Sequence, residues 1–445
     1  MKAVNRVELK NLIVDIFDCL NRENIIYIIL RNYDELPESV GHDIDILVSE
    51  DDITRFSIIL VETARIDGWF LVQSANRSSF KSFFFVPIPF SLNKNGLKID
   101  VWSPISWRGL TWIDSEIALN TRSYNANGFY IPSPGVEAAS LLLKDLLQHG
   151  KINAKYFEKI QEQSIMDPET FRKVLQKPFG QSLSDQLLIA AQERKWNELE
   201  IATNSIRNSL VKKSIIDAPF RAFKNTLKFI FGHLNAFIYG NNNLFICFIG
   251  PDGSGKTTLS FKIRDALIDI FENISYYHGH YGFLPELKTF HPSASLNEKT
   301  KNSSHYSQKE PSSVIYCLLM FYYAIDYMML YPRAFFKKNK SELIIFDRYF
   351  YDYLIQPTPF KISGSLFHLI AKVVPSPDIL IYLKSPAQLI YKRKPELTIS
   401  EISRQSVICD QIVAELPNTF SIDNSDSLEN VTSEIINTIL KFMIK

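Results

Sequence analysis

The chain has 445 residues, which is too long for one ordinary hydrophobic core and predicts two or three domains. Its 49 Lys and Arg residues nearly balance its 48 Asp and Glu residues, so no net basic field points to general nucleic-acid binding. The four scattered cysteines form no Cys-x-x-Cys pair, which argues against a disulfide framework or a zinc site. The N-terminus lacks the long apolar segment of a signal peptide, and together these features predict a cytoplasmic protein.

The first 155 residues mix helical and strand patterns, which predicts an α+β domain over 1–155. One short apolar run, Ile25–Leu30, is rich in β-formers. Two segments alternate with period two, as half-buried strands do: Asp43–Val48 and Leu97–Trp102. Two further segments have helical patterns, and the second has a proline near its start: Val7–Leu20 and Pro134–Gln148.

Three aspartates lie on the two alternating segments. Asp43 and Asp45 are two residues apart, so both side chains face the same way on a strand, and Asp100 lies on the second segment. Two carboxylates on one face can hold Mg²⁺ beside a triphosphate. An Asp-x-Asp pair with a third acid on a neighbouring strand resembles the nucleotidyltransferase superfamily. The resemblance implies that fold, with these three aspartates as metal ligands.

The segment before the Asp-x-Asp pair departs from that superfamily. In place of a Gly-Ser turn that binds triphosphate, the chain has Leu30–Tyr33, where Arg31 is a candidate replacement donor for phosphate. Two interpretations stay open because function depends on the site and not on the fold. The domain either catalyses nucleotidyl transfer, or keeps the fold and binds a nucleotide, a sugar phosphate or nothing.

Residues 156–240 carry helical patterns and few strand signals, which predicts a helical connector. Its last part, Phe220–Tyr239, is amphipathic and basic. Such a helix either lies on a membrane surface or packs its apolar face on a neighbouring domain, and the second interpretation is favoured.

Residues 241–445 alternate between strand and helix, which predicts a doubly wound α/β domain with a parallel sheet. Three apolar runs are expected to be its buried strands: Leu244–Ile249, Leu343–Phe346 and Ile379–Leu383. The almost wholly apolar Val314–Pro332 is nearly long enough to span a bilayer, but its place inside this domain favours a buried helix.

The strongest motif is Gly250-Pro-Asp-Gly-Ser-Gly-Lys-Thr257, which matches G-x-x-x-x-G-K-[ST] between a β-rich run and a helical segment. Its glycines let the backbone wrap around phosphates, Lys256 can reach the β- and γ-phosphates, and the Thr257 hydroxyl can join a magnesium shell. The motif therefore predicts binding of ATP and Mg²⁺. The predicted cofactor-binding residues in and beside the loop are Gly250, Asp252, Gly253, Ser254, Gly255, Lys256, Thr257 and Thr258.

Three blocks in this region resemble thymidylate kinases: the loop with Asp252 in third place, Asp347-Arg348-Tyr349 at a strand end, and Pro375–Pro386 followed by Tyr391–Glu396. They occur in the family's order over roughly the last 200 residues. The resemblance implies a P-loop kinase fold. It also implies that Asp347 holds the magnesium shell, that Arg348 grips the acceptor phosphate and that Asp252 contacts the acceptor near its sugar.

The resemblance places Arg393 and Lys394 in the family's lid, where cations can stabilise charge on the transferred group and Glu396 can orient them. Lys256, Arg348, Arg393 and Asp252 are therefore the predicted catalytic residues, and Lys394 a cofactor-binding one. An ordinary solvated charge cluster is the alternative for the lid pair.

Two features depart from simple thymidylate kinases. Tyr276–Tyr281, predicted to follow the second strand, is rich in rings and includes His278 and His280, and a long polar insert, Ser293–Ser312, follows. The pattern is closer to thymidylate kinase-like proteins of bacterial surface-polysaccharide gene clusters. The two histidines contact a substrate or serve the fold, with a structural role favoured.

The function expected from the sequence is an ATP-dependent kinase for a nucleoside monophosphate or a sugar-containing acceptor, fused to a nucleotidyltransferase-like domain. A nucleotidyltransferase with an ATP-driven regulatory domain and a non-enzymatic ATP-binding adaptor are the alternatives. The expected partner is a small nucleotide or sugar phosphate, with no nucleic acid; membrane association is not favoured, and the oligomeric state is left open.

Overall fold

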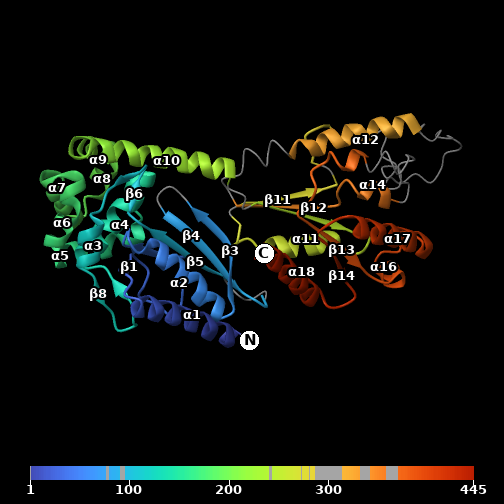
Figure 1. Cartoon of the computed structure of the whole chain (residues 1–445), viewed down its shortest axis with the longest axis horizontal. Helices are drawn as coiled ribbons and strands as arrows, with labels where there is room; N and C mark the ends of the chain where they lie inside the picture. Colours follow the sequence, from blue (N-terminus) through green and yellow to red (C-terminus); the bar gives the residue numbers. More distant parts are fainter. Residues whose placement is uncertain are drawn as a thin grey trace. The chain divides into compact units, whose positions relative to one another are not determined.

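The computed structural model describes residues 2–76, 80–90, 96–239, 243–271, 273–279, 281–285, 313–330, 341–356 and 369–444. The chain divides into two compact units, Met1–Ala236 and Phe237–Met443 (Figure 1). The helices predicted to connect two domains lie almost entirely within the first unit.

The first unit contains a mixed five-stranded sheet with the order β1-β2-β5-β4-β3. Its central strands β2 and β5 are parallel, and their register sets Asp45 directly opposite Asp100. The pairs β1–β2, β5–β4 and β4–β3 are antiparallel. The strand bounds are β1 Tyr27–Ile29, β2 Ile44–Val48, β3 Trp69–Asn76, β4 Phe80–Pro87 and β5 Leu97–Trp102.

Helices cover both faces of β2. Ile44 and Ile46 pack in a core cluster with residues of α1 (Lys2–Arg22) and α2 (Ile53–Ile66). Leu47, on the opposite face, belongs to a second cluster with α4 (Pro134–His149). All five residues of β2 are therefore buried, and the prediction that this strand is half-buried was wrong. The predicted helix beginning near Pro134 is confirmed, with the proline in its first turn.

The remaining elements of the first unit pack around α4. Residues of α5, α6, α7 and α9 share its hydrophobic cluster, which explains why the predicted connector belongs to this unit. The helix bounds are α3 Ser115–Asn120, α5 Phe157–Met166, α6 Pro168–Phe179, α7 Gln181–Gln192, α8 Trp196–Ile201, α9 Thr203–Asp217 and α10 Pro219–Tyr239. The short strands are β6 Ser106–Trp107, β7 Leu110–Thr111, β8 Ser123–Tyr124 and β9 Tyr130–Ile131.

The second unit contains a parallel sheet with the order β11-β12-β10-β13-β14. Its bounds are β10 Leu244–Ile249, β11 Asn273–His278, β12 Glu342–Asp347, β13 Ile379–Lys384 and β14 Thr419–Asp423. The three predicted buried strands are confirmed as β10, β12 and β13. The edge strands β11 and β14 are only partly buried and carry too many polar residues to give an apolar run.

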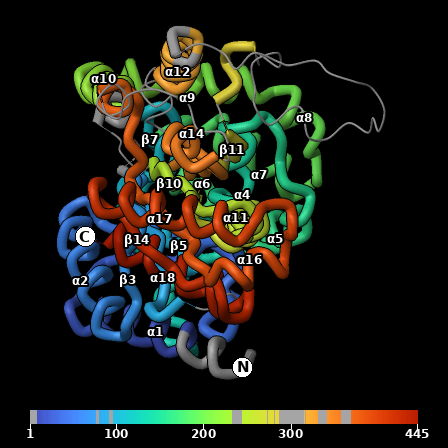
Figure 2. The backbone as a smooth tube through the Cα atoms, turned by 90° about the vertical axis from the view of Figure 1, so that its right-hand side faces the viewer, coloured from blue at the N-terminus to red at the C-terminus, as the bar shows by residue number. Residues whose placement is uncertain are grey.

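Helices lie on both faces of this sheet, so the predicted α/β architecture is confirmed (Figure 2). Residues of α12 and α17 share a hydrophobic cluster with one face of β10, β12 and β13. Helix α11 contacts β10 and β12, and α18 contacts both α11 and β14. The helix bounds are α11 Lys256–Ala266, α12 Ser313–Met328, α14 Asp352–Ile355, α16 Ala387–Arg393, α17 Ile399–Glu415 and α18 Leu428–Met443.

The expectation that Val314–Pro332 is a helix buried on all sides needs a correction. Helix α12 buries Met320 and Tyr327 against the sheet, but Leu318 and Ile325 are 64% and 49% exposed. A helix that covers one face of a sheet buries only one stripe of side chains. Among the described residues, no helix combines the length and the apolar character that crossing a membrane requires.

Candidate phosphate-binding and acidic sites

The predicted phosphate-binding loop leaves the carboxyl end of the central strand β10. Gly250, Gly253 and Gly255 have φ values of 152°, 88° and 90°, a region that L side chains rarely adopt. A Cβ atom at Gly255 would also lie 2.8 Å from the Asn424 side-chain nitrogen. The glycines therefore allow a tight loop whose last residues lead directly into α11, and the N-terminus of α11 supplies positive potential.

Lys256 lies inside this loop. Its ammonium donates to the carbonyl oxygens of Gly250 and Pro251 at 2.7 and 3.0 Å, and the residue is 5% exposed. Burial lowers the pKa of Lys256, and the neighbouring Arg348 lowers it further. The Asp252 carboxylate lies 3.9 Å from this ammonium, beyond hydrogen-bond distance, so the cation remains available to an incoming anion.

Asp347 ends the adjacent strand β12 and is fully buried. Its Oδ2 atom accepts hydrogen bonds from the Thr257 hydroxyl and from Tyr276 at 3.1 Å, and it lies 3.2 Å from Nδ1 of His278. Its Oδ1 atom has no hydrogen-bond partner among the described residues. Burial alone would raise the pKa of Asp347, but bonds from His278 and Thr257 outweigh it and hold the pKa below its ordinary value. An ionised carboxylate beside a hydroxyl fits the oxygen ligands that Mg²⁺ prefers.

Arg348 follows Asp347 and joins two carboxylates. Its guanidinium donates to Asp252 in the loop and, at 3.3 Å, to Asp352 at the start of α14. The backbone of Arg348 has a φ of 73°, which a non-glycine residue seldom adopts. The fork is thus directed from the end of β12 towards the phosphate-binding loop by a strained backbone and two ion pairs.

Helix α17 forms hydrogen bonds with both the loop and the end of α14. The side chain of Gln405 accepts a hydrogen bond from the Asp252 amide at 3.3 Å and donates to Glu401 at 3.0 Å. Arg404 pairs with Glu401 and donates to two carbonyl oxygens at the end of α14. A ring of contacts therefore joins the loop, α14 and α17. Sequence reasoning missed Gln405; the only available signal was a polar residue on the apolar stripe of a helix.

The predicted lid residues lie at the end of α16. Arg393 donates to the Asn424 carbonyl at 2.9 Å, and Lys394 forms a 2.9 Å ion pair with Glu396 while remaining 45% exposed. A Cβ atom at Gly253 would lie 3.0 Å from Cβ of Lys394, so this segment touches the loop.

The segment Tyr276–Tyr281, rich in aromatic and imidazole rings, begins within strand β11. Tyr276, Tyr277 and His278 are the last three residues of β11, not residues that follow it as predicted. Tyr277 stacks on Phe346, whereas His278 reaches Asp347 and remains partly exposed. His280 and the polar insert 293–312 lie outside the described residues.

In the first unit, the carboxylates of Asp43, Asp45 and Asp100 come together, with one oxygen of each within 4.8 Å of the others. Asp45 and Asp100 are buried on β2 and β5, and Asp43 lies just before β2. Their spacing and their hard oxygen atoms fit a divalent cation.

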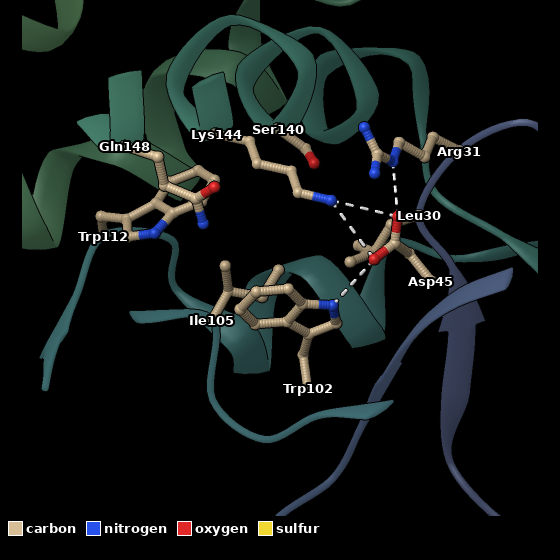
Figure 3. Close-up of a pocket in the computed structure, with 9 residues that line it drawn as sticks. All are labelled: Leu30, Arg31, Asp45, Trp102, Ile105, Trp112, Ser140, Lys144 and Gln148. Carbon is tan, nitrogen blue, oxygen red and sulfur yellow. Dashed lines mark hydrogen bonds and ion pairs between the residues drawn. The ribbon is translucent and has the colours of Figure 1, made fainter. Parts of the chain in front are cut away.

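The structure also gives Asp45 three nitrogen donors (Figure 3). Arg31 pairs with its Oδ2 atom, Lys144 on α4 lies 3.1 Å from that atom, and the indole of Trp102 donates to Oδ1 at 3.1 Å. Burial alone would raise the pKa of Asp45, but Lys144 and Arg31 outweigh it and lower the pKa. A cation that binds Asp45 would have to displace these partners. Sequence reasoning missed Lys144, since α4 is far from β2 in the chain.

The Asp100 carboxylate accepts hydrogen bonds from fewer side chains than that of Asp45. It accepts a hydrogen bond from Ser82 at 2.6 Å and from Lys98 at 3.2 Å. Burial raises the pKa of Asp100, and Lys98 and Ser82 only partly offset that effect. The pocket beside Asp45 is small and is lined by buried side chains, among them Trp102 and Trp112.

Comparison with solved structures shows similarity to thymidylate kinase from Ehrlichia chaffeensis. The two chains are 18% identical, the match covers 44% of this chain and 98% of that chain, and the TM-score is 0.29. Neither the protein-family models nor the curated proteins give a match. At this TM-score the similarity carries no functional weight, so the chemistry is inferred from the residues of the two sites.

Proposed function

We propose that the second unit is an ATP- and Mg²⁺-dependent phosphotransferase that acts on a nucleoside monophosphate or a sugar-containing acceptor. The observation that carries this proposal is the hydrogen bond between Thr257, in the first turn of α11, and Asp347, at the end of β12. Ligands of open parallel sheets bind at the carboxyl ends of the strands, where these two residues lie.

Each residue has a role in this proposal. The loop amides and Lys256 bind the ATP phosphates, and Thr257 and Asp347 hold Mg²⁺, which neutralises charge on the phosphates. Arg348, which pairs with Asp252 and Asp352, grips the acceptor, and Asp252 contacts the acceptor near its sugar. Phosphoryl transfer needs positioning and charge stabilisation more than covalent help from the protein, and these residues provide both.

Several further expectations belong to the same proposal. Arg393 and Lys394 are proposed to move towards the transferred group when the lid closes, leaving Asn424 and Glu396. The kinase is proposed to occupy 241–445 and the nucleotidyltransferase-like domain 1–155, with the helices of 156–240, which pack almost entirely in the first unit, leading from one to the other. A cytoplasmic small-molecule enzyme with no nucleic-acid partner fits the balanced charge of the chain.

The test is ADP production from MgATP by the full chain against a panel of nucleoside monophosphates, sugars and sugar phosphates. We expect at least one acceptor to raise the rate above ATP hydrolysis in water, and Asp347→Asn to abolish the increase because the magnesium ligand is lost. Asp265→Asn changes an exposed acid of the same unit and serves as the matched control. An ATP-binding adaptor would bind MgATP yet give no increase with any acceptor, which would contradict the proposal.

A second function, nucleotidyl transfer by the first unit, is favoured by the convergence of Asp43, Asp45 and Asp100. The N–H donors on Asp45 oppose it, because a metal must compete with Arg31 and Lys144.

Electron paramagnetic resonance with Mn²⁺ tests this second function, using an Asp347→Asn background to remove the other metal site. We expect Asp43→Asn to weaken Mn²⁺ binding and Lys144→Met to strengthen it, since Lys144 competes for Asp45. Asp51→Asn, at an exposed acid of the same unit, is the control. If neither Asp43→Asn nor Lys144→Met changes the affinity for Mn²⁺, the three aspartates do not form a metal site.

A further inference from the structure

Helix α10 carries an apolar stripe that the rest of the first unit does not cover. Phe220 and Phe223 are 89% and 66% exposed, and Ile230 and Phe231 are 46% and 56% exposed. With Leu227, these residues recur at the spacing of one helical face. Soluble proteins expose single large apolar side chains commonly, but a contiguous stripe of this kind marks an interaction surface.

The first unit contacts α10 from another side. Ala222 is buried, and the backbone of Asn225 is so close to Gly109 that a Cβ atom there would lie 2.5 Å from the Asn225 oxygen. Residues 222 and 225 lie more than 100° around the helix from the centre of the stripe, at about 100° per residue. The contact with the rest of the first unit therefore leaves the stripe uncovered within this unit.

Basic residues flank the stripe. Lys224 and Lys228 are exposed along one edge of the stripe, Arg221 is exposed farther round on the same side, and Pro219–Tyr239 contains no Asp or Glu. A Phe-rich apolar face bordered by Lys and Arg is the composition of helices that lie in the plane of an anionic bilayer surface. The absence of any acid disfavours a protein surface of mixed charge, on which pairs of both signs would be expected.

We propose that α10 attaches the chain to an anionic lipid surface, with Phe220, Phe223, Ile230 and Phe231 entering the interface and Arg221, Lys224 and Lys228 facing the headgroups. The proposed binding is peripheral, because the helix lies in the surface and does not cross it. This role is independent of the proposed kinase activity.

Sedimentation of the full chain with phosphatidylcholine vesicles, with and without phosphatidylserine, tests the proposal. We expect binding only to the vesicles that contain phosphatidylserine. The double change Lys224→Gln and Lys228→Gln should lower the partition coefficient about 25-fold, at about five-fold for each lysine. The double change Phe220→Ser and Phe223→Ser should lower it at least as much and leave the melting temperature unchanged.

The control pairs Ile66→Ser, an 84%-exposed apolar residue of α2, with Lys173→Gln on α6, and it should bind vesicles as the wild type does. Absence of vesicle binding by the wild type, or binding that persists in both double variants, would overturn the proposal. A much lower melting temperature or a changed oligomeric state of the phenylalanine variant would also overturn the proposal, because the stripe would then pack against protein.

Discussion

Replacing Lys256 with Ala is expected to weaken MgATP binding about 10- to 100-fold and to slow phosphoryl transfer by about 10²–10³. The ammonium of Lys256 lies inside the loop, where it donates to the carbonyl oxygens of Gly250 and Pro251 and lies 3.9 Å from the Asp252 carboxylate. An ATP phosphate that enters the loop offers this cation a stronger, charge-assisted partner. Alanine removes that contact and leaves the loop amides as the main phosphate donors.

Calorimetric titration with MgATP and a transfer assay on the same preparation measure the two effects. Lys262→Ala removes an exposed lysine from the same helix and should change neither value. The circular dichroism and melting temperature of Lys256→Ala should stay close to those of the wild type, because the lost contacts lie within one loop. A folded Lys256→Ala chain with unchanged ATP affinity would show that the loop does not bind the triphosphate.

The residues that could be predicted are those whose contacts are local in sequence. Apolar runs predict the strand Leu244–Ile249 and the strand that ends at Asp347. The motif predicts the loop between β10 and α11, because its glycines adopt positive φ values that other residues rarely adopt. The juxtaposition of Thr257 and Asp347 then follows from the parallel sheet, in which β10 and β12 are neighbours.

The residues that could not be predicted act across long sequence separations. Lys144 reaches Asp45 from α4, and Gln405 reaches the amide of Asp252 from α17. Neither residue belongs to a motif, and each lies within an ordinary helical pattern. Tertiary packing brings them to their sites, so periodicity and spacing carry no information about these contacts.

The edge strands were missed for a related reason. β11 carries Asn273, Ser275 and His278, and these polar residues break the apolar run by which a buried strand is recognised. The consequence concerns function, since His278 and Tyr276 are the residues of this strand that contact Asp347. The surroundings of the proposed magnesium ligand are thus built partly from a strand whose position the sequence did not predict.

Replacing Arg348 with Lys is expected to lower the rate of phosphoryl transfer to a phosphorylated acceptor strongly, while the affinity for ATP stays nearly unchanged. A guanidinium can hold two oxygens at once with a planar fork, whereas an ammonium is a point charge. In the structure Arg348 spans Asp252 and Asp352, and a lysine at this position cannot bridge both carboxylates in the same way. We expect the activation barrier to rise by about 2–4 kcal/mol, as when a preorganised donor is removed.

The size of this loss distinguishes the candidate acceptors. A nucleoside monophosphate presents a phosphate to Arg348, so the full loss is expected, whereas an unphosphorylated sugar should show a smaller one. A domain that only changes shape with ATP should show no change in turnover. Arg264→Lys is the matched control, because Arg264 also pairs with a carboxylate, that of Asp265, and both side chains are exposed on α11. Equal transfer rates in the wild type and Arg348→Lys would defeat the assignment, and the acceptor contacts would then be sought at Tyr277, His278 and Tyr281 around the end of β11.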